Sequence, residues 1–211
     1  MRLIGMLDSP YVRRVAIALQ LLELRFEHQS LSVFSTFEQF AQINPVVKAP
    51  TLVCDDGGVL MDSTLILQYA HALSPARSLV PTALADLQNA LHIEGLALAA
   101  CEKAVQIVYE RKLRPADKLH EPWIARVAGQ LRAACDGLEH ALAQHPLAAT
   151  SAEISQAGVS TAVAWHFIQQ MVPDMVPAER YPDLVAYAAL AEALPEFRAA
   201  PHGDSVYRHG G

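Results

Sequence analysis

NPVVKAPTLVCDDGGVLMDS, residues 44–63, is the stretch that decides the fold of this chain. Two short apolar runs flank an Asp-Asp-Gly-Gly turn at 55–58, and they predict a β-hairpin because Asp and Gly tolerate the positive φ of tight turns. Asp62 or Ser63 then follows as the N-cap of a helix. The stretch therefore predicts a hairpin that leads directly into a helix.

Elements before this stretch complete the order β-α-β-α-β-β-α. Residues 2–7 predict a buried strand, and Pro10 stands at the first position of the helix that follows. A second strand is predicted over 25–30 and a short helix over 36–43. One mixed sheet with helices on its faces satisfies that order, so residues 1–76 are predicted to form an α/β domain.

Beyond a proline-containing linker at 74–81 the strand signals disappear. Apolar residues with a seven-residue period predict one long helix over 82–113, and the pattern repeats further along the chain. The helix after Ser155 is apolar nearly all round, which indicates the centre of a helical bundle. Residues 82–211 are therefore predicted to form an all-α domain, with an unstructured tail from Pro201.

Composition and charge exclude several classes of protein. With 52% hydrophobic and 18% charged residues, the chain is globular and well buried. The formal net charge of −6 and the lack of a basic stripe argue against nucleic-acid binding. The two tight basic clusters, Arg13-Arg14 and residues 111–114, are interpreted as solvated helix surface. No apolar run approaches roughly 18 residues, so no membrane span is predicted.

Cysteine and histidine usage argues against metal and disulfide chemistry. The three cysteines are widely spaced with no CxxC, and the nine histidines have no metal-binding spacing. The first apolar run is too short for a signal peptide. A reducing cytoplasm is therefore the predicted compartment, and no metal is predicted.

Two motifs together resemble the glutathione transferases, most of all their serine-type branches. S-P-Y-V-R-R-V at 9–15 is paired with N-P-x-x-K-x-P-x-L at 44–52, which Asp62-Ser63 closes. The resemblance covers about 80 N-terminal residues well and the helical half more loosely. It implies a thioredoxin-like first domain with a mixed four-stranded sheet, glutathione as co-substrate and a homodimer.

Ser9 is the predicted catalytic residue. From the residues alone it is the cap of the helix that starts at Pro10. A hydroxyl that donates to sulfur favours the thiolate, and so does a nearby helix N-terminus. In the serine-type transferases the serine at the matching position stabilises the glutathione thiolate, so the resemblance assigns that role to Ser9, together with the cap.

The other glutathione contacts are carried over from the resemblance position by position. Ala49 matches a residue whose backbone pairs with the cysteinyl unit, and Pro50 matches the cis-proline of the family. Asp62 and Ser63 match the acid and serine that hold the γ-glutamyl end, and Lys48 matches a lysine that reaches the glycine carboxylate. From the residues alone, a plain hairpin with a capped helix is the alternative.

Two positions depart from the family pattern. Val47 replaces the usual glycine before the lysine, which puts the geometry of that loop in question. Gly158 stands where the family has an acidic residue that completes a capping box, so the start of that helix is predicted to be weaker by up to ~1 kcal/mol.

A hydrophobic second substrate is predicted to bind between the two halves. Its candidate side chains are those of Phe34, Tyr109 and Trp165, each of which also suits the core.

The leading interpretation is a cytosolic homodimeric glutathione transferase in detoxification, whose glutathione thiolate attacks an electrophilic carbon. Two alternatives stay open. One is a glutathione-dependent isomerase, whose usual S-S-C-x-W differs from the sequence at 8–11. The other is a glutathione-binding regulatory protein without catalysis.

Overall fold

The computed structural model describes residues 1–208, and these form two compact units. Residues 1–79 and the C-terminal segment from Ala193 make up the first unit, and Val80–Glu192 make up the second. The predicted limits 82–211 had placed the segment from Ala193 in the helical domain, whereas the structure assigns it to the first unit. As independently folding parts, the two domains stay a prediction.

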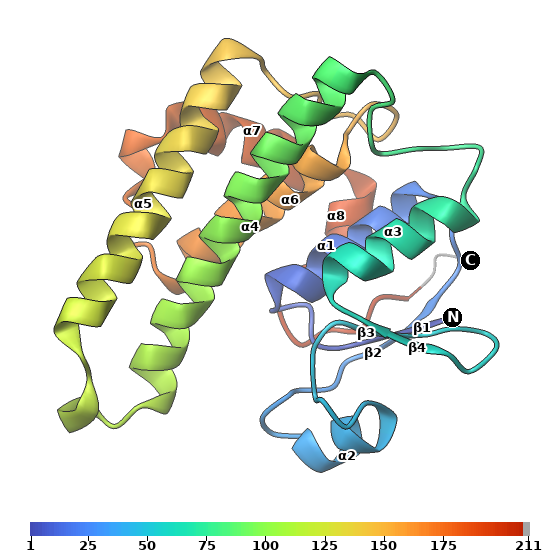
Figure 1. Cartoon of the computed structure of the whole chain (residues 1–211), viewed down its shortest axis with the longest axis horizontal. Coiled ribbons are helices and arrows are strands. Elements are labelled where there is room, and N and C mark those ends of the chain that lie inside the picture. The colour runs from blue at the N-terminus through green and yellow to red at the C-terminus, as the bar shows by residue number, and fades with distance from the viewer. Residues whose placement is uncertain (209–211) are drawn as a thin grey trace. The chain divides into compact units, whose positions relative to one another are not determined.

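The first unit is built on a four-stranded sheet with the strand order β2-β1-β3-β4 (Figure 1). β1 pairs in parallel with β2 and antiparallel with β3, and β3 forms an antiparallel hairpin with β4. The predicted mixed sheet of a thioredoxin-like fold is therefore confirmed. The strands are β1 (Arg2–Ile4), β2 (Glu27–Gln29), β3 (Thr51–Val53) and β4 (Val59–Met61).

Helices cover both faces of this sheet. α1 (Pro10–Leu21) and α3 (Ser63–Leu73) contact each other on one face, and α2 (Phe37–Ile43) lies on the other (Figure 1). Under α2, the buried side chain of Phe40 packs with those of Ile4 and Leu31. In the C-terminal segment, α8 (Pro195–Ala199) packs against α1.

Arg13 and Arg14 are buried, so the prediction that they are solvated helix surface is wrong. Their side chains are 2% and 1% exposed. Arg13 Nε donates to the carbonyl oxygen of Ala200 at 2.8 Å, and Arg14 Nη1 donates to Ser63 Oγ at 3.0 Å. A buried guanidinium is tolerated only where its donors are used. These acceptors supply that compensation from distant parts of the chain.

The C-terminal tail is structured through its described part, in contrast to the prediction. The ring of Tyr207 stacks on that of Phe26, with ring centroids 4.6 Å apart. The backbone N–H of Tyr207 donates to Nδ1 of His28 at 3.0 Å. The tail is therefore anchored beside the edge strand β2. Residues 209–211, which belonged to the predicted unstructured tail, lie outside the described residues.

The contact between Tyr207 and His28 requires one protonation state of His28. Nε2 lies 2.7 Å from the carbonyl oxygen of Gly5, while Nδ1 accepts from Tyr207, so the neutral ring with its proton on Nε2 satisfies both partners. Burial lowers the pKa of His28 from its ordinary 6.5, and the hydrogen bond to Gly5 opposes that shift only in part. A proton on Nδ1 would remove the acceptor that Tyr207 uses.

The first unit is therefore expected to lose stability in mild acid. Because the unfolded chain binds this proton more readily, the contribution of His28 is complete above pH 6.5 and is lost as the pH falls through the lower folded pKa. Urea denaturation between about pH 5 and 7.5 measures this slope. His28→Gln should remove that part of the pH dependence, and identical slopes in both proteins would contradict the assignment.

The second unit is a helical bundle, as predicted. α4 (Leu84–Leu113) and α5 (Glu121–Gln144) run antiparallel beside each other, and α6 (Gln156–Met171) packs on α4 (Figure 1). α6 is buried on nearly every side, which confirms it as the central helix, and α7 (Pro182–Glu192) packs on α5 and α6. Two 3₁₀ turns, η1 (Ala116–Lys118) and η2 (Ala178–Arg180), complete the unit. Among residues 1–208, no helix has the length and apolar character that a membrane span requires.

Candidate functional site

The charged candidates Lys48 and Asp62 meet where the hairpin leads into α3. Lys48 Nζ lies 3.6 Å from Asp62 Oδ2, and both side chains are about half exposed. The other carboxylate oxygen of Asp62 caps α3 by accepting from the N–H of Thr64 at 2.9 Å. Exposed ion pairs contribute at most about 1 kcal/mol. A ligand with both charges can therefore separate this pair at little cost.

Asp62 is held in an unusual backbone conformation. Its φ of +61° lies in the left-handed region, which favours glycine over other residues. Non-glycine residues with such φ values cluster at ligand sites, where the surrounding structure holds them in place. The conformation turns the chain from β4 into α3, and it sets the carboxylate at the start of that helix.

Ser63 is fixed from inside the protein. Its side chain is 2% exposed, and Oγ accepts from Arg14 Nη1 at 3.0 Å. The same nitrogen lies 3.4 Å from Thr64 Oγ1. Arg14 on α1 therefore holds the first residues of α3, and the N-terminal end of a helix favours carboxylates. Arg14 is a residue of this site that the sequence reasoning missed.

Ala49 and Pro50 stand just before β3. The peptide bond between them is cis, the form that the resemblance implied for Pro50. Gly5, at the end of β1, allows the close approach of this segment to α1. A Cβ at Gly5 would lie 3.1 Å from Ala49 Cβ and 2.6 Å from Val12 Cγ2, and its φ of +135° also favours glycine. Gly5 lies inside the strand predicted over residues 2–7, and an isolated glycine in a strand pattern, which often marks a close backbone approach, was the available signal.

Ser9 caps α1, which confirms the cap predicted from the residues alone. Its Oγ accepts from the N–H of Val12 at 3.4 Å, and its carbonyl oxygen accepts from the N–H of Arg13 at 3.0 Å. The cap contact is long and uses only a lone pair of the hydroxyl. The O–H of Ser9 therefore keeps its capacity to donate to a ligand at the N-terminus of α1.

The loop before Lys48 keeps a glycine-like backbone without a glycine. Val47 has a φ of +52°, an outlier for a β-branched side chain that costs roughly 1–2 kcal/mol. Its N–H donates to the carbonyl oxygen of Asn44 at 2.9 Å. Buried Asn44 also ties the loop to the sheet, because its amide donates to Thr51 Oγ1 at 2.8 Å. The substitution at Val47 therefore leaves this loop in the conformation that a glycine would favour.

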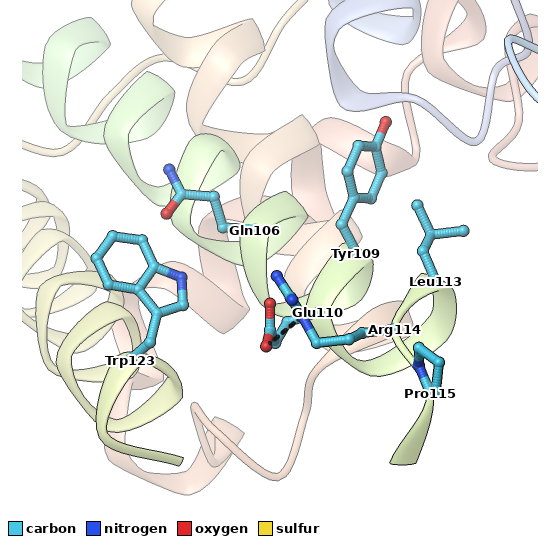
Figure 2. Close-up of a pocket in the computed structure, with 7 residues that line it drawn as sticks. All are labelled: Gln106, Tyr109, Glu110, Leu113, Arg114, Pro115 and Trp123. Carbon is cyan, nitrogen blue, oxygen red and sulfur yellow. Dashed lines mark ion pairs between the residues drawn. The ribbon is translucent and has the colours of Figure 1, made fainter. Parts of the chain in front are cut away.

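The three candidates for a hydrophobic substrate site lie in different environments. Phe34 is 54% exposed in the loop before α2. Tyr109 is 44% exposed on α4 and lines a pocket near the end of that helix (Figure 2). Trp165 is 5% exposed and packs on the ring of Tyr181, with centroids 5.6 Å apart. Trp165 is therefore a core residue, the alternative that its sequence pattern left open.

Metal ligation has no candidate cluster among the described residues. Residues 1–208 contain no group of three or more His, Cys, Asp or Glu side chains placed to hold an ion.

Comparisons with known proteins agree with this architecture. A family model described as glutathione S-transferase, N-terminal domain, matches residues 3–78. The uncharacterized GST-like protein YibF of Escherichia coli (strain K12) is 26% identical over 173 residues, which cover 82% of this chain and 85% of that protein.

Two solved structures extend the likeness over the whole chain. A glutathione S-transferase from Methylobacterium radiotolerans, in complex with glutathione sulfonate, has a TM-score of 0.86 and 23% identity, and the match covers 100% of this chain and 99% of that one. A glutathione transferase family member from Pseudomonas fluorescens Pf-5, with bound S-(propanoic acid)-glutathione, has a TM-score of 0.77 and 27% identity, with 95% and 98% covered. Residues 3–78 therefore match the glutathione S-transferase N-terminal domain, and over most of its length the chain is similar to members of that superfamily.

Proposed function

We propose that this protein is a glutathione transferase that conjugates the glutathione thiolate to hydrophobic electrophiles. The observation that carries the proposal is the meeting of Lys48 and Asp62 at the start of α3, with Ser63 fixed beneath by Arg14. Relatives in the superfamily crystallised with glutathione derivatives support it. The proposed role is detoxification in the cytoplasm, where glutathione supplies the thiol.

Glutathione carries one ammonium group and two carboxylates, and the site offers a complement to each. Asp62 is assigned to the γ-glutamyl ammonium, and Lys48 to the glycine carboxylate. The N–H groups at the start of α3 and Ser63 are assigned to the γ-glutamyl carboxylate. The backbone of Ala49, next to Pro50, pairs with the cysteinyl unit as an added strand would. Each assignment uses a group that lies in the first unit.

Ser9 is assigned to the thiol. An alkyl thiol has a pKa of about 8.5, so most of it is protonated at neutral pH. A hydrogen bond from the Ser9 hydroxyl and the N-terminus of α1 favour the thiolate. The thiolate then forms a C–S bond to the electrophilic carbon, and the carbon's leaving group departs with its electron pair. The proton of the thiol is released to solvent before attack.

Ser9→Ala tests this assignment. At neutral pH, turnover with glutathione and a halogenated nitrobenzene should fall roughly ten- to hundredfold, because less thiolate forms. The KM for glutathione should change little, and the deficit should shrink at alkaline pH as the thiol ionises without help. Steady-state kinetics over a pH series measure all three quantities.

Ser9→Thr is the matched control, since it keeps both the hydroxyl and the helix cap. Loss of the cap alone should lower the free energy of unfolding by about 1 kcal/mol, which a urea titration separates from catalysis. Unchanged turnover and an unchanged pH profile in Ser9→Ala would remove Ser9 from the mechanism. Calorimetric glutathione binding without turnover in the wild type would favour a regulatory protein instead.

We also propose that two copies form a homodimer through α3. Leu65, Tyr69 and Leu73 follow each other at four-residue spacing, and they are 57%, 37% and 42% exposed. Such an apolar stripe suits a self-complementary contact with a second copy. Leu65→Glu should shift the protein toward monomer in sedimentation velocity. Leu190→Glu, at an exposed leucine of α7, is the control that should leave assembly unchanged. A monomeric wild type would rule out the dimer.

A further inference from the structure

The buried side chain of Asn44 has its orientation fixed by the loop that follows it. Asn44 is 3% exposed, and its Oδ1 accepts from the N–H of Val46 at 3.0 Å. Because a backbone N–H only donates, this contact identifies the amide oxygen and leaves the amide nitrogen on the other side. There Nδ2 donates to Thr51 Oγ1 at 2.8 Å and lies 3.4 Å from Met61 Sδ. Asn44 is therefore a fixed donor to Thr51.

Thr51 passes this orientation on to the peptide group between Lys48 and Ala49. Thr51 is fully buried, and its hydroxyl carries one proton. Since Asn44 donates to Oγ1, that proton goes to the carbonyl oxygen of Lys48, which lies 2.7 Å away. A buried amide and a buried hydroxyl that are both satisfied in this way favour one arrangement of the chain. The carbonyl of Lys48 is therefore held toward the buried hydroxyl.

The same peptide group carries the N–H of Ala49. The peptide bond between Lys48 and Ala49 is trans. In a planar trans peptide the carbonyl and the N–H point in opposite directions, so the N–H of Ala49 points away from Thr51. This N–H has no acceptor within the part of the chain that the structure describes. The hydrogen bonds of Asn44 and Thr51 thus present a backbone donor next to the side chain of Lys48.

We propose that Thr51 is a positioning residue for the cysteinyl unit of glutathione, with Asn44 as the side chain that orients it. This role rests on the proposed function, which assigns the backbone of Ala49 to that unit. A ligand that pairs with the chain as an added strand needs a donor aimed at its carbonyl, and Thr51 aims the N–H of Ala49. No group of glutathione is assigned to Thr51 itself. Its role also differs from that of Arg14, which supports the γ-glutamyl end of the site at α3.

The test compares glutathione with γ-glutamylcysteamine, which keeps the γ-glutamyl end and the thiol but lacks the cysteinyl carbonyl and the glycine. Calorimetry gives both dissociation constants in one protein, so partial unfolding changes both equally and leaves their ratio intact. The wild type is expected to bind glutathione about tenfold more tightly than γ-glutamylcysteamine. Thr51→Val keeps the volume and removes the hydroxyl. It should weaken the binding of glutathione about fivefold and leave that of γ-glutamylcysteamine unchanged.

Two substitutions serve as controls. Thr51→Ser keeps the hydroxyl and should keep the affinity for glutathione within about twofold of the wild type. Thr161→Val makes the same change at a fully buried threonine of the second unit, whose Oγ1 donates to the carbonyl oxygen of Ala157 at 2.8 Å. It should leave both dissociation constants unchanged.

Hydrogen exchange in the wild type tests the orientation of Ala49 without any substitution. When glutathione binds, the N–H of Ala49 should become protected from exchange in NMR spectra, because it then donates to the ligand. Binding of γ-glutamylcysteamine should leave it unprotected. An N–H that stays unprotected in both complexes would contradict the proposal.

The results distinguish a wrong role for Thr51 from a wrong function. If the wild type prefers glutathione and Thr51→Val keeps that preference, the role of Thr51 is refuted and the transferase function stands. The same holds if Thr51→Ser loses the preference as Thr51→Val does, or if Thr161→Val loses it too. Equal binding of the two ligands by the wild type would refute the assignments of Lys48, Ala49 and Thr51 together. A wild type that does not bind glutathione would overturn the proposed function, and the role of Thr51 with it.

Discussion

Arg14→Met is expected to lower the free energy of unfolding by about 3 kcal/mol, because hydrogen bonds from a buried charged group are among the strongest. The methionine fills much of the volume but leaves Ser63 Oγ without its donor at 3.0 Å and Thr64 Oγ1 without its contact at 3.4 Å. Both oxygens belong to the first turn of α3. Urea denaturation of purified protein measures the change.

Arg14→Lys separates charge from geometry. The ammonium keeps the charge but lacks the planar fork, so a smaller loss is expected, in the range of 1–2 kcal/mol. Arg25→Met, at an exposed arginine of the same unit, should stay within about 0.5 kcal/mol of the wild type. If Arg14→Met had the same free energy of unfolding as Arg25→Met, the buried guanidinium would have no structural role.

The same substitution bears on the proposed glutathione site. No group of glutathione is assigned to Arg14. It is therefore a positioning residue that acts through its hydrogen bond to Ser63. Arg14→Met is expected to raise the dissociation constant for glutathione about tenfold, since the start of α3 loses its support. Under saturating glutathione, turnover should recover. That split between affinity and turnover distinguishes Arg14 from Ser9, whose loss lowers turnover and leaves affinity nearly intact.

The features that sequence reasoning predicted correctly are local ones. The Asp-Asp-Gly-Gly hairpin, the Ser9 cap and the Asp62 cap depend on residues a few positions apart, and the sequence shows all of those residues together. The resemblance supplied the positions that no local rule identifies, such as the cis bond before Pro50. Val47 stood out only as a departure from the family pattern, and its φ of +52° could not be inferred from its side chain.

The features that sequence reasoning missed depend on contacts between residues far apart in the sequence. Helical periodicity placed Arg13 and Arg14 on the outer face of α1, but the partner of Arg14 is 49 residues away and that of Arg13 is 187 away. The tail from Pro201 was predicted to be unstructured for the same reason, because Tyr207 binds His28, which is 179 residues away in the sequence. Periodicity describes one helix against a generic core, and it contains no information about what covers the other face.

Gly158→Ala is expected to destabilise the second unit by about 2–3 kcal/mol, although glycine to alanine within a helix usually gains up to about 1 kcal/mol. A Cβ at this position would overlap the hydroxyl oxygen of Tyr187 and would lie 3.2 Å from Ile154 Cγ1. Tyr187 is 5% exposed, so its ring has little room to move. The acidic residue usual in the family would meet the same obstacle.

Tyr187→Phe supplies the compensating change. It removes the overlapping oxygen, and the nearest remaining ring atom, Cζ, would lie 3.5 Å from the new Cβ. Alone it should change the free energy of unfolding little, since within residues 1–208 the hydroxyl makes only a long contact of 3.5 Å with the carbonyl oxygen of Ala148. Combined with Gly158→Ala it should recover most of the lost stability, while the cap from Gly158 N–H to Ser155 Oγ, at 3.1 Å, persists in every variant. Thermal and urea unfolding of the four proteins give the coupling energy. Additive effects of the two substitutions on the free energy of unfolding would show that the backbone of α6, and not the hydroxyl of Tyr187, requires a glycine at position 158.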